Sequence, residues 1–481
     1  MRVGRCRALA ALLAAALLPA CMNLAPSYER PPAPVATAWP VRAEGTDVGA
    51  PAAADVAWSE FYGDAELRRL IDLALAANRD LRTTALDIEA ARAAYRIARA
   101  AEFPTVVAGA SLTRAGAGGG TNLAGVATST RQVAVEAGIS AFEVDLFGRL
   151  RNQRDQALET LLGAEETLRA ARIALVAEVA IAWITLAADR QRLQLAEETL
   201  ASQQRSYDLT RRTFALGAAS GLDVAQARTS VDTARADIAT YRTQVAQDLN
   251  ALVLLVGQPL DDALVASPPA AGDRPLLAAG VVGPGTELPS DLLQRRPDVL
   301  AAERALRAAN ANVGAARAAR FPTISLTTSV GAASASLGRL FAGGTGVWSF
   351  VPAVGQAIFD GGALRARQRA AEVQRETALA RYDLAVQTAF REVADALAQR
   401  RDIDVLIDAR RSLVAATERS YRLSEARYRR GVDSYLVVLD AQRSLYAAQL
   451  SLITARLQQA ANAVTLYAVL GGGWREAAAP E

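Results

Sequence analysis

The chain has 481 residues, of which 53 are basic, 50 are acidic and none is histidine. Without histidine the usual general base and the usual zinc ligand are missing, which argues against an enzyme and against a metal site. The first 20 residues hold three arginines and no acid, so the remainder has 50 basic and 50 acidic side chains. A nucleic-acid-binding protein carries a basic excess, so this balance argues against nucleic acid as a partner.

Residues 1–20 are predicted to be a lipoprotein signal peptide. Three arginines precede an apolar run that is too short to span a bilayer as a helix. The run ends in Leu18-Pro19-Ala20-Cys21, which resembles a bacterial lipoprotein cleavage site. We expect Cys21 to carry a diacylglycerol and an N-acyl chain, with no other cofactor. Met22 after it favours the outer membrane. The alternative is an ordinary signal peptide followed by a chance cysteine.

The mature chain repeats one plan twice. Ten positions in the first half match positions 214 residues later without a gap, nine of them with the same residue and Phe214 with Tyr428. The first set is Tyr207, Phe214, Gly217, Leu222, Ala227, Ser230, Gln244, Ala246, Leu252 and Gly257, and the second is Tyr421, Tyr428, Gly431, Leu436, Ala441, Ser444, Gln458, Ala460, Leu466 and Gly471. A period this long indicates duplication of a domain-sized unit rather than a solenoid.

The repeats set the predicted domain boundaries. An extended N-terminal arm, or equatorial segment, covers 21–64, and the first repeat covers 65–257. A Pro- and Gly-rich equatorial linker at 258–289 leads to the second repeat at 290–471, and a tail covers 472–481. Each repeat opens with a predicted helix, at roughly 65–101 and 290–320. A Phe-Pro pair ends each helix, because proline disfavours helical backbone in the residue before it.

A pair of strands is predicted next in each repeat, at about 104–145 and 322–359. Apolar Val133, Val135, Ala137, Ile139 and Ala141 alternate with Gln132, Ala134, Glu136, Gly138 and Ser140, and the second repeat alternates in the same way from Thr323. Period-two alternation indicates strands with one apolar and one polar face. Small-residue links at 116–129 and 331–346 separate the strands of each pair.

Long helices complete each repeat. The stretches 150–257 and 353–479 contain no proline. Apolar residues recur in steps of three and four, as in a coiled-coil seam. These residues are Ile173, Val176, Ala180, Trp183 and Ala187 in one repeat and Leu379, Tyr382, Val386, Ala389, Val393 and Ala396 in the other. Glycines break the pattern, so each stretch is predicted to be a helical hairpin with its tip near 217–222 or 431–436.

Four strands per chain constrain how the protein meets a membrane. After the signal no uninterrupted apolar run is long enough for a spanning helix, so a membrane span would have to use strands. Strands in a bilayer must close into a barrel, and the smallest familiar barrels have eight. One chain therefore cannot close a barrel alone, and we expect an oligomer. Trp348, Phe350 and Phe359 are candidates for the interfacial belts of such a barrel.

Several motifs in this order are typical of one family. They are Cys21-x-Asn23-Leu24-Ala25-Pro26-x-Tyr28-x-x-Pro31, Trp58-x-x-Phe61-x-x-Asp64, Asn78-x-Asp80-Leu81-Arg82, Asp145-Leu146-Phe147-Gly148-Arg149, Leu288-Pro289-Ser290-x-Leu292-Leu293-x-Arg295-Arg296-Pro297-Asp298 and Phe359-Asp360-Gly361-Gly362. With them the chain resembles the outer membrane factors of tripartite efflux pumps, in the OprM/NodT-type lipoprotein branch of the TolC superfamily. The resemblance runs from Cys21 to Gly471.

The resemblance implies a mixed α+β membrane protein that works as a homotrimer. Three chains would share a 12-stranded outer-membrane β-barrel that continues into a long periplasmic α-helical barrel. The partners would be a periplasmic adaptor and an inner-membrane transporter of the RND type. The channel would export drugs or other small molecules passively, without a catalytic step.

The resemblance also places a periplasmic gate just after the second tip. Leu436, Asp440 and Arg443 match residues that narrow the pore in relatives, and spacings of four and three put them on one helix face. Three copies of Asp440 around an axis would form a negative ring that favours cations. The alternative is that Asp440 and Arg443 form an ordinary solvated i,i+3 ion pair.

Other positions near the tips have implied roles as well. Tyr428 matches a tyrosine that helps to latch the tips, although core packing would explain an aromatic residue there equally well. Gly217, Gly221 and Gly431 are expected at the adaptor-facing tips, although a helix turn needs glycine in any case.

Two other functions remain open at this point. The exit duct of a type I protein-secretion system has the same fold and differs only in cargo and partner. A lipid-anchored periplasmic coiled-coil scaffold would explain the signal and the long helices without a channel.

Overall fold

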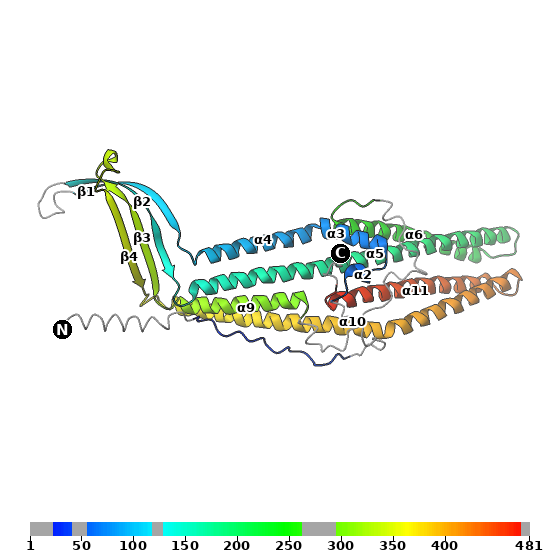
Figure 1. Cartoon of the computed structure of the whole chain (residues 1–481). Helices are drawn as coiled ribbons and strands as arrows, with labels where there is room; N and C mark the ends of the chain where they lie inside the picture. The colour runs from blue at the N-terminus through cyan, green and yellow to red at the C-terminus, as the bar shows by residue number, and fades with distance from the viewer. Residues whose placement is uncertain (1–22, 41–54, 118–127, 262–294, 473–481) are drawn as a thin grey trace, which may run out of the picture. The chain divides into compact units, whose positions relative to one another are not determined.

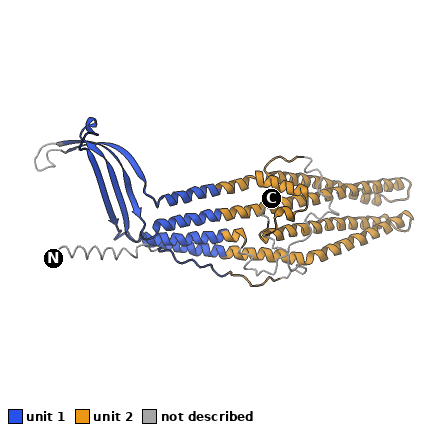
Figure 2. Ribbon diagram, viewed as in Figure 1, with its two compact units in different colours: residues 1–32, 87–164, 301–382 blue, residues 33–86, 165–300, 383–481 orange. Residues whose placement is uncertain are grey.

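The structure is a computed structural model that describes residues 23–40, 55–117, 128–261 and 295–472. The predicted signal, Cys21, most of the linker and nearly all of the tail lie outside these residues. The chain divides into two compact units (Figure 2). Unit 1 takes residues 1–32, 87–164 and 301–382, and unit 2 takes 33–86, 165–300 and 383–481. Each unit therefore combines corresponding parts of both repeats.

Unit 1 contains one antiparallel sheet of four strands in the order β1-β2-β3-β4 (Figure 1). The strands are β1 (Val106–Ala117), β2 (Thr128–Val144), β3 (Thr323–Ser334) and β4 (Gly346–Gly355). The two repeats meet where β2 pairs with β3. Gly331 lies inside β3, so the expected link beginning at residue 331 was placed too early.

The strand register separates an apolar face from a polar face, because directly opposed residues point to the same side of a sheet. The apolar face carries Val106, Ala108, Ala110 and Leu112 of β1, Val133, Val135, Ala137, Ile139, Phe142 and Val144 of β2, Ile324, Leu326, Thr328 and Val330 of β3, and Trp348, Phe350, Pro352 and Val354 of β4. The polar face carries mainly Gly, Ser, Thr and Ala, together with Gln132, Glu136 and Glu143, and its larger apolar residues are Val107, Val347 and Val351.

A β-bulge in β2 corrects the expected alternation. Ser140 and Ala141 together oppose Thr327, since the register shifts between Ile139 and Phe142. Ala141 adopts a left-handed backbone with φ 51°, and its N–H donates to Thr327 Oγ1 at 3.1 Å. An extra residue inserted in this way reverses the parity of the strand beyond it. Phe142, and not Ala141, therefore continues the apolar face.

Two glycines allow β2 and β3 to lie close together. A Cβ atom on Gly138 would lie 2.2 Å from the Thr328 carbonyl oxygen, and one on Gly331 would lie 2.1 Å from the Val135 carbonyl oxygen. Both obstacles are backbone atoms of the neighbouring strand, which cannot rotate away. Glycine in a strand interior is typical of such close approach.

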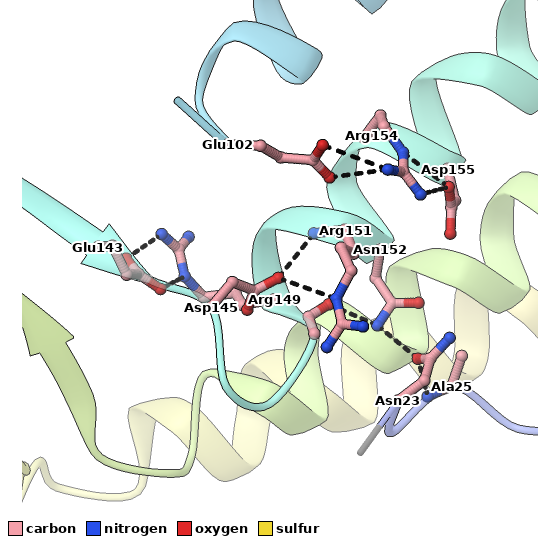
Figure 3. A network of polar contacts seen from close by, with 11 residues as sticks. Asn23, Ala25, Glu102, Glu143, Asp145, Arg149, Arg151, Asn152, Arg154 and Asp155 are labelled. Carbon is pink, nitrogen blue, oxygen red and sulfur yellow. Dashed lines mark hydrogen bonds and ion pairs between the residues drawn. The ribbon is translucent and has the colours of Figure 1, made fainter. Parts of the chain in front are cut away.

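The N-terminal arm is tied to the start of α5 (Arg149–Ala215), where the chain leaves β2 (Figure 3). Asn152 Nδ2 donates to Asn23 Oδ1 at 2.8 Å. The Arg151 N–H donates to Asp145 Oδ2 at 2.9 Å, so Asp145 satisfies one of the free backbone donors at the helix start. One polar cluster thus joins the end of β2, the start of α5 and the N-terminal arm.

A buried carboxylate holds the same arm against α9 (Pro297–Ala318). Glu303 is 3% exposed and accepts hydrogen bonds from Tyr28 Oη at 3.1 Å, from Arg30 Nη2 at 2.6 Å and from Arg307 Nη2 at 2.6 Å. Burial opposes ionisation of Glu303, but the hydrogen bonds from the two arginines outweigh it and lower the pKa. The helix begins at Pro297, a favoured first position, rather than at the expected residue 290. Residues 290–294 lie outside the described part.

The first predicted helix is in fact two helices, α3 (Ala65–Ala77) and α4 (Arg79–Ala100). They are separated by Asn78, which has an extended ψ of 133°. Its Nδ2 donates to the Leu255 carbonyl at 2.8 Å, and its Oδ1 accepts from the Leu81 N–H at 2.8 Å. The asparagine thus caps the second helix while it holds the end of α6 (Gly221–Val256).

Unit 2 is built on the long helices around one apolar core. The predicted seam residues of α5 are buried, and Trp183 at the centre is 0% exposed. In α10 (Ala363–Arg429) the seam is buried from Tyr382 to Ala396, but Leu379 is 37% exposed and was wrongly included. The short helix α2 (Trp58–Phe61) joins the core, where the Phe61 ring stacks on Tyr467 of α11 (Tyr435–Val469) at 3.9 Å.

One stretch of α5 is long and apolar enough to cross a membrane as a helix. Half of this stretch is buried inside the protein, and Val176, Val179 and Trp183 belong to the core of unit 2. Core helices of large proteins have the same composition. The apolar character of this stretch is therefore explained by packing within the chain.

The close approach of β2 and β3 yields a prediction. Gly331→Ala should lower stability by about 1–3 kcal/mol, the usual cost of overpacking, because the new methyl group meets fixed backbone. The measurement is the thermal unfolding midpoint of the detergent-solubilised protein. Gly109→Ala is the matched control, since a Cβ there has no atom within 4 Å. Equal midpoints for the two variants would show that the strands can separate at no cost.

Candidate functional site

The tips of the two helical hairpins in unit 2 are the first part of the site. Gly217 ends the turn after α5 with φ 75°, and Gly431 does the same after α10 with φ 74°. A Cβ atom would meet nothing within 4 Å at either position. Their glycine identity thus follows from the left-handed backbone at a helix end. Gly221 differs, because it is the first residue of α6 and lacks a positive φ.

The two tips are closed by different interactions. In the first, the Asp223 N–H donates to Ser220 Oγ and the Ser220 N–H donates to Asp223 Oδ2, which forms a capping box. In the second, Ser434 makes no side-chain cap, and Arg427 binds Asp433 through two hydrogen bonds of 2.5 and 2.9 Å. These bonds lower the pKa of the Asp433 carboxyl.

Sequence reasoning missed both closures. The capping box has a readable signal, a serine followed three residues later by an acid before an apolar helix. The Arg427–Asp433 pair has none, because a separation of six residues across a turn matches no helical spacing. The first repeat has Thr213 and Ala219 at the equivalent positions, so only the second tip carries the pair.

Apolar side chains are exposed around both tips. Leu216 and Leu222 are 84% and 66% exposed beside the first turn, and Val432 is 60% exposed in the second. Solvent does not favour apolar groups at a turn, so a cluster of this kind is typical of a docking surface.

The predicted gate residues lie on one exposed face at the start of α11. Tyr435, Val438 and Leu439 point into a small core with Ala227 of α6. Leu436, Asp440 and Arg443 lie on the opposite side and are exposed. The structure therefore brings the three residues onto a common face, and that face has no cover within one chain.

Asp440 and Arg443 do not form the ordinary ion pair that was the alternative interpretation. Within the described residues, Asp440 makes no hydrogen bond or ion pair. Arg443 reaches instead to α6, where its Nη2 lies 3.5 Å from Thr229 Oγ1. Thr229 is the residue that corresponds to Arg443 in the first repeat, so the repeats meet face to face at this point.

Tyr428 packs beside the same small core. Its ring centroid lies 5.6 Å from that of Tyr435, and burial raises the pKa of both phenols, to about 12 for Tyr435. Phe214, its counterpart in the first repeat, is half exposed. Core packing thus accounts for Tyr428 within one chain, and a latch role for it remains a hypothesis.

Cys21, the predicted lipidation site, lies outside the described residues. Asn23, two positions later, is fixed beside Asn152. In the described ranges no cluster of acidic, Cys or His side chains has the composition of a metal site.

Comparison with known proteins identifies relatives over nearly the whole chain. A family model described as outer membrane efflux protein matches residues 70–258 and 288–472. The toluene efflux pump outer membrane protein TtgC of Pseudomonas putida is 46% identical over 459 residues, which cover 94% of this chain and 93% of that protein. Outer membrane protein OprJ of Pseudomonas aeruginosa is 46% identical over 470 residues, covering 97% and 96%. A crystal structure of a membrane protein from Pseudomonas aeruginosa superposes with a TM-score of 0.85 at 44% identity, covering 93% and 100%.

The ion pair at the second tip leads to a prediction. Arg427→Gln should speed amide hydrogen exchange in the turn at residues 430–434, because the pair is the side-chain closure of that turn. Arg429→Gln is the control, since it removes an exposed i,i+4 pair with Glu425 from the same helix end. Exchange that is equally fast in the two variants would contradict a special role for Arg427.

Proposed function

Because the chain belongs to the outer membrane efflux protein family, we propose that three copies form one channel through which small molecules leave the periplasm passively. Members of this family are transporter components rather than enzymes. The chain is an outer-membrane exit channel of a tripartite efflux pump, with a long periplasmic part. The relatives include outer membrane proteins of a toluene and of an antibiotic efflux pump, which supports small organic molecules as the cargo here.

The four-stranded sheet is the observation that supports a shared barrel most directly. It has an apolar face suited to lipid and a polar face suited to water, and its edge strands β1 and β4 each have one neighbour. A bilayer offers no hydrogen bonds to a free strand edge. Three copies of four strands give twelve, which exceeds the smallest familiar closed barrel.

The gate is proposed at Leu436, Asp440 and Arg443. All three are exposed on one face of α11, and Asp440 has no counter-charge among the described residues. Around a threefold axis these side chains would form an apolar ring, an acidic ring and a basic ring. The apolar ring would restrict passage, the acidic ring would favour cations and the basic ring would oppose them.

The assembly is proposed to use both ends of the protein. The exposed leucines and Val432 at the tips, around Gly217, Gly221 and Gly431, would meet the periplasmic adaptor, which connects to an inner-membrane transporter of the RND type. The diacylglycerol and N-acyl chain on Cys21 would enter the membrane beside the sheet, where the arm is held by Asn23 and Glu303. A protein-secretion duct would share this fold, but no feature of the chain favours it.

The gate proposal is tested by conductance. Asp440→Ala with Arg443→Ala should raise single-channel conductance in planar bilayers, because both charged rings are removed. Asp232→Ala with Arg235→Ala is the control, since it removes an exposed pair of the same types and spacing on α6. Unchanged conductance in the first variant would exclude these residues as the constriction.

The assembly is tested by native mass. Protein extracted from outer membranes in mild detergent should have three times the mass of the mature chain, with acyl chains on the N-terminal Cys21 peptide. Cys21→Ser should lose the acyl chains and still require detergent, because the apolar face of the sheet holds it in the membrane. A monomer that is soluble without detergent would instead fit the lipid-anchored scaffold.

A further inference from the structure

The two ends of the sheet in unit 1 differ in charge. In the antiparallel order, the β1–β2 and β3–β4 connections lie at the same end, named here the hairpin end. The described residues of this end, 110–117, 128–135 and 332–346, contain three arginines and no aspartate or glutamate. The arginines are Arg114, Arg131 and Arg339. This half of the sheet is therefore purely basic.

The opposite end, from which the helices leave, has arginines that are matched by acids (Figure 3). Arg149 Nε donates to Glu143 Oε1 at 2.7 Å, and Arg154 Nη1 lies 3.0 Å from Glu102 Oε1. Arg151 lies 3.6 Å from Asp145. At this end, then, the arginines that hold elements together are each paired with a carboxylate. The arginines of the hairpin end have no such partners among the described residues.

Arg114 and Arg131 lie directly opposite each other on β1 and β2. They occupy the apolar face, one step beyond the opposed pair Leu112 and Val133. Both are exposed, and neither contacts a carboxylate in the described part of the chain. Like charges directly opposite each other destabilise a strand pair. The arrangement therefore requires an anion from outside the chain to become favourable.

The position on the sheet defines the kind of anion. The apolar face lies against lipid tails in the proposed barrel, so the first polar residues beyond it lie at the level of the headgroups. Since the helices extend into the periplasm, the hairpin end lies in the outer leaflet. A guanidinium binds phosphate oxygens in a bidentate fashion, and two adjacent guanidiniums suit a phosphorylated headgroup.

We propose that Arg114 and Arg131 form a binding site for the phosphate groups of phosphorylated glycolipids in the outer leaflet, with Arg339 of the β3–β4 connection adding positive charge nearby. This inference rests on the proposed function, because it needs the sheet to span the outer membrane. The bound lipid would cover the rim of the barrel and offset the repulsion between the two arginines. It would be a structural ligand, separate from the exported cargo.

The test titrates the full-length, detergent-purified protein with diphosphorylated lipid A and follows binding by native mass spectrometry. Arg114→Gln with Arg131→Gln should weaken binding about thirtyfold, since each arginine near an anionic surface contributes about 1 kcal/mol. Arg114→Lys with Arg131→Lys should retain most of the affinity. Arg205→Gln with Arg419→Gln, two exposed arginines on the long helices, should bind as the wild type does.

Two further arms identify the ligand. Lipid A stripped of its phosphates should bind weakly, and inorganic phosphate at the same concentration should not displace the phosphorylated lipid. The proposal is overturned if the double Gln variant binds as the wild type does, if the dephosphorylated lipid binds equally well, or if free phosphate competes. Conductance of the same preparations distinguishes failure of the proposed function from failure of the lipid-binding inference. Absence of channels would refute the proposed function, whereas normal channels without lipid selectivity would refute this inference alone.

Discussion

Backbone hydrogen bonding at the edges of the four-stranded sheet is the constraint on which the rest of the structure depends. β1 and β4 each have a partner on one side only, and the apolar face makes the sheet unsuited to water. Hydrocarbon cannot satisfy the free edge groups, so only other strands can. This constraint is the physical reason for proposing a barrel that several chains share in the outer membrane.

Other features of unit 1 serve the same closure. Gly138 and Gly331 allow two strands from different repeats to approach more closely than any side chain permits. The bulge at Ser140 and Ala141 changes the strand parity, so that Phe142 returns to the apolar face. Bulges and glycines of this kind bend a sheet locally. The two repeats thus each contribute one β-hairpin, and the glycines and the bulge where β2 pairs with β3 allow the two hairpins to form one curved sheet.

The residues that carry the family motifs act mainly as joints between elements. Asp64 accepts hydrogen bonds from two N–H groups at the start of α3, and Asn78 separates α3 from α4. Arg296 is 8% exposed and binds Asp298, Glu392 and the Val469 carbonyl. A passive channel needs no reactive side chains, but it needs fixed angles where helices and strands meet. The motif positions that are described here are explained by that need.

The gate face follows a different principle. Leu436, Asp440 and Arg443 are exposed, since the opposite face of α11 supplies the small core, and of the three only Arg443 makes a side-chain hydrogen bond to another described residue, Thr229. The proposed gate gives these residues a function around the axis of a trimer. The basic hairpin end of the sheet likewise has charges that no described acidic residue of the chain balances, and the proposed lipid phosphates would balance them.

The sequence by itself determined the duplication, the number of strands, the long helices and the positions of their tips. These features depend on local signals, namely period-two and period-three-to-four patterns and the placement of proline and glycine. The common exposed face of Leu436, Asp440 and Arg443 was predictable as well, because spacings of four and three define one side of a helix.

Only the tertiary structure decided the break at Asn78, the start of α9 at Pro297, the bulge in β2 and the extension of β3 through Gly331. Each depends on atoms distant in sequence, such as the Leu255 carbonyl that receives Asn78 or the Val135 carbonyl beside Gly331. The Arg427–Asp433 closure and the opposition of Arg114 and Arg131 depend on turn geometry and strand register in the same way. A sequence pattern indicates which residues can form a helix or a strand. Contacts with residues distant in sequence determine where that helix or strand ends and which charged side chains lie side by side.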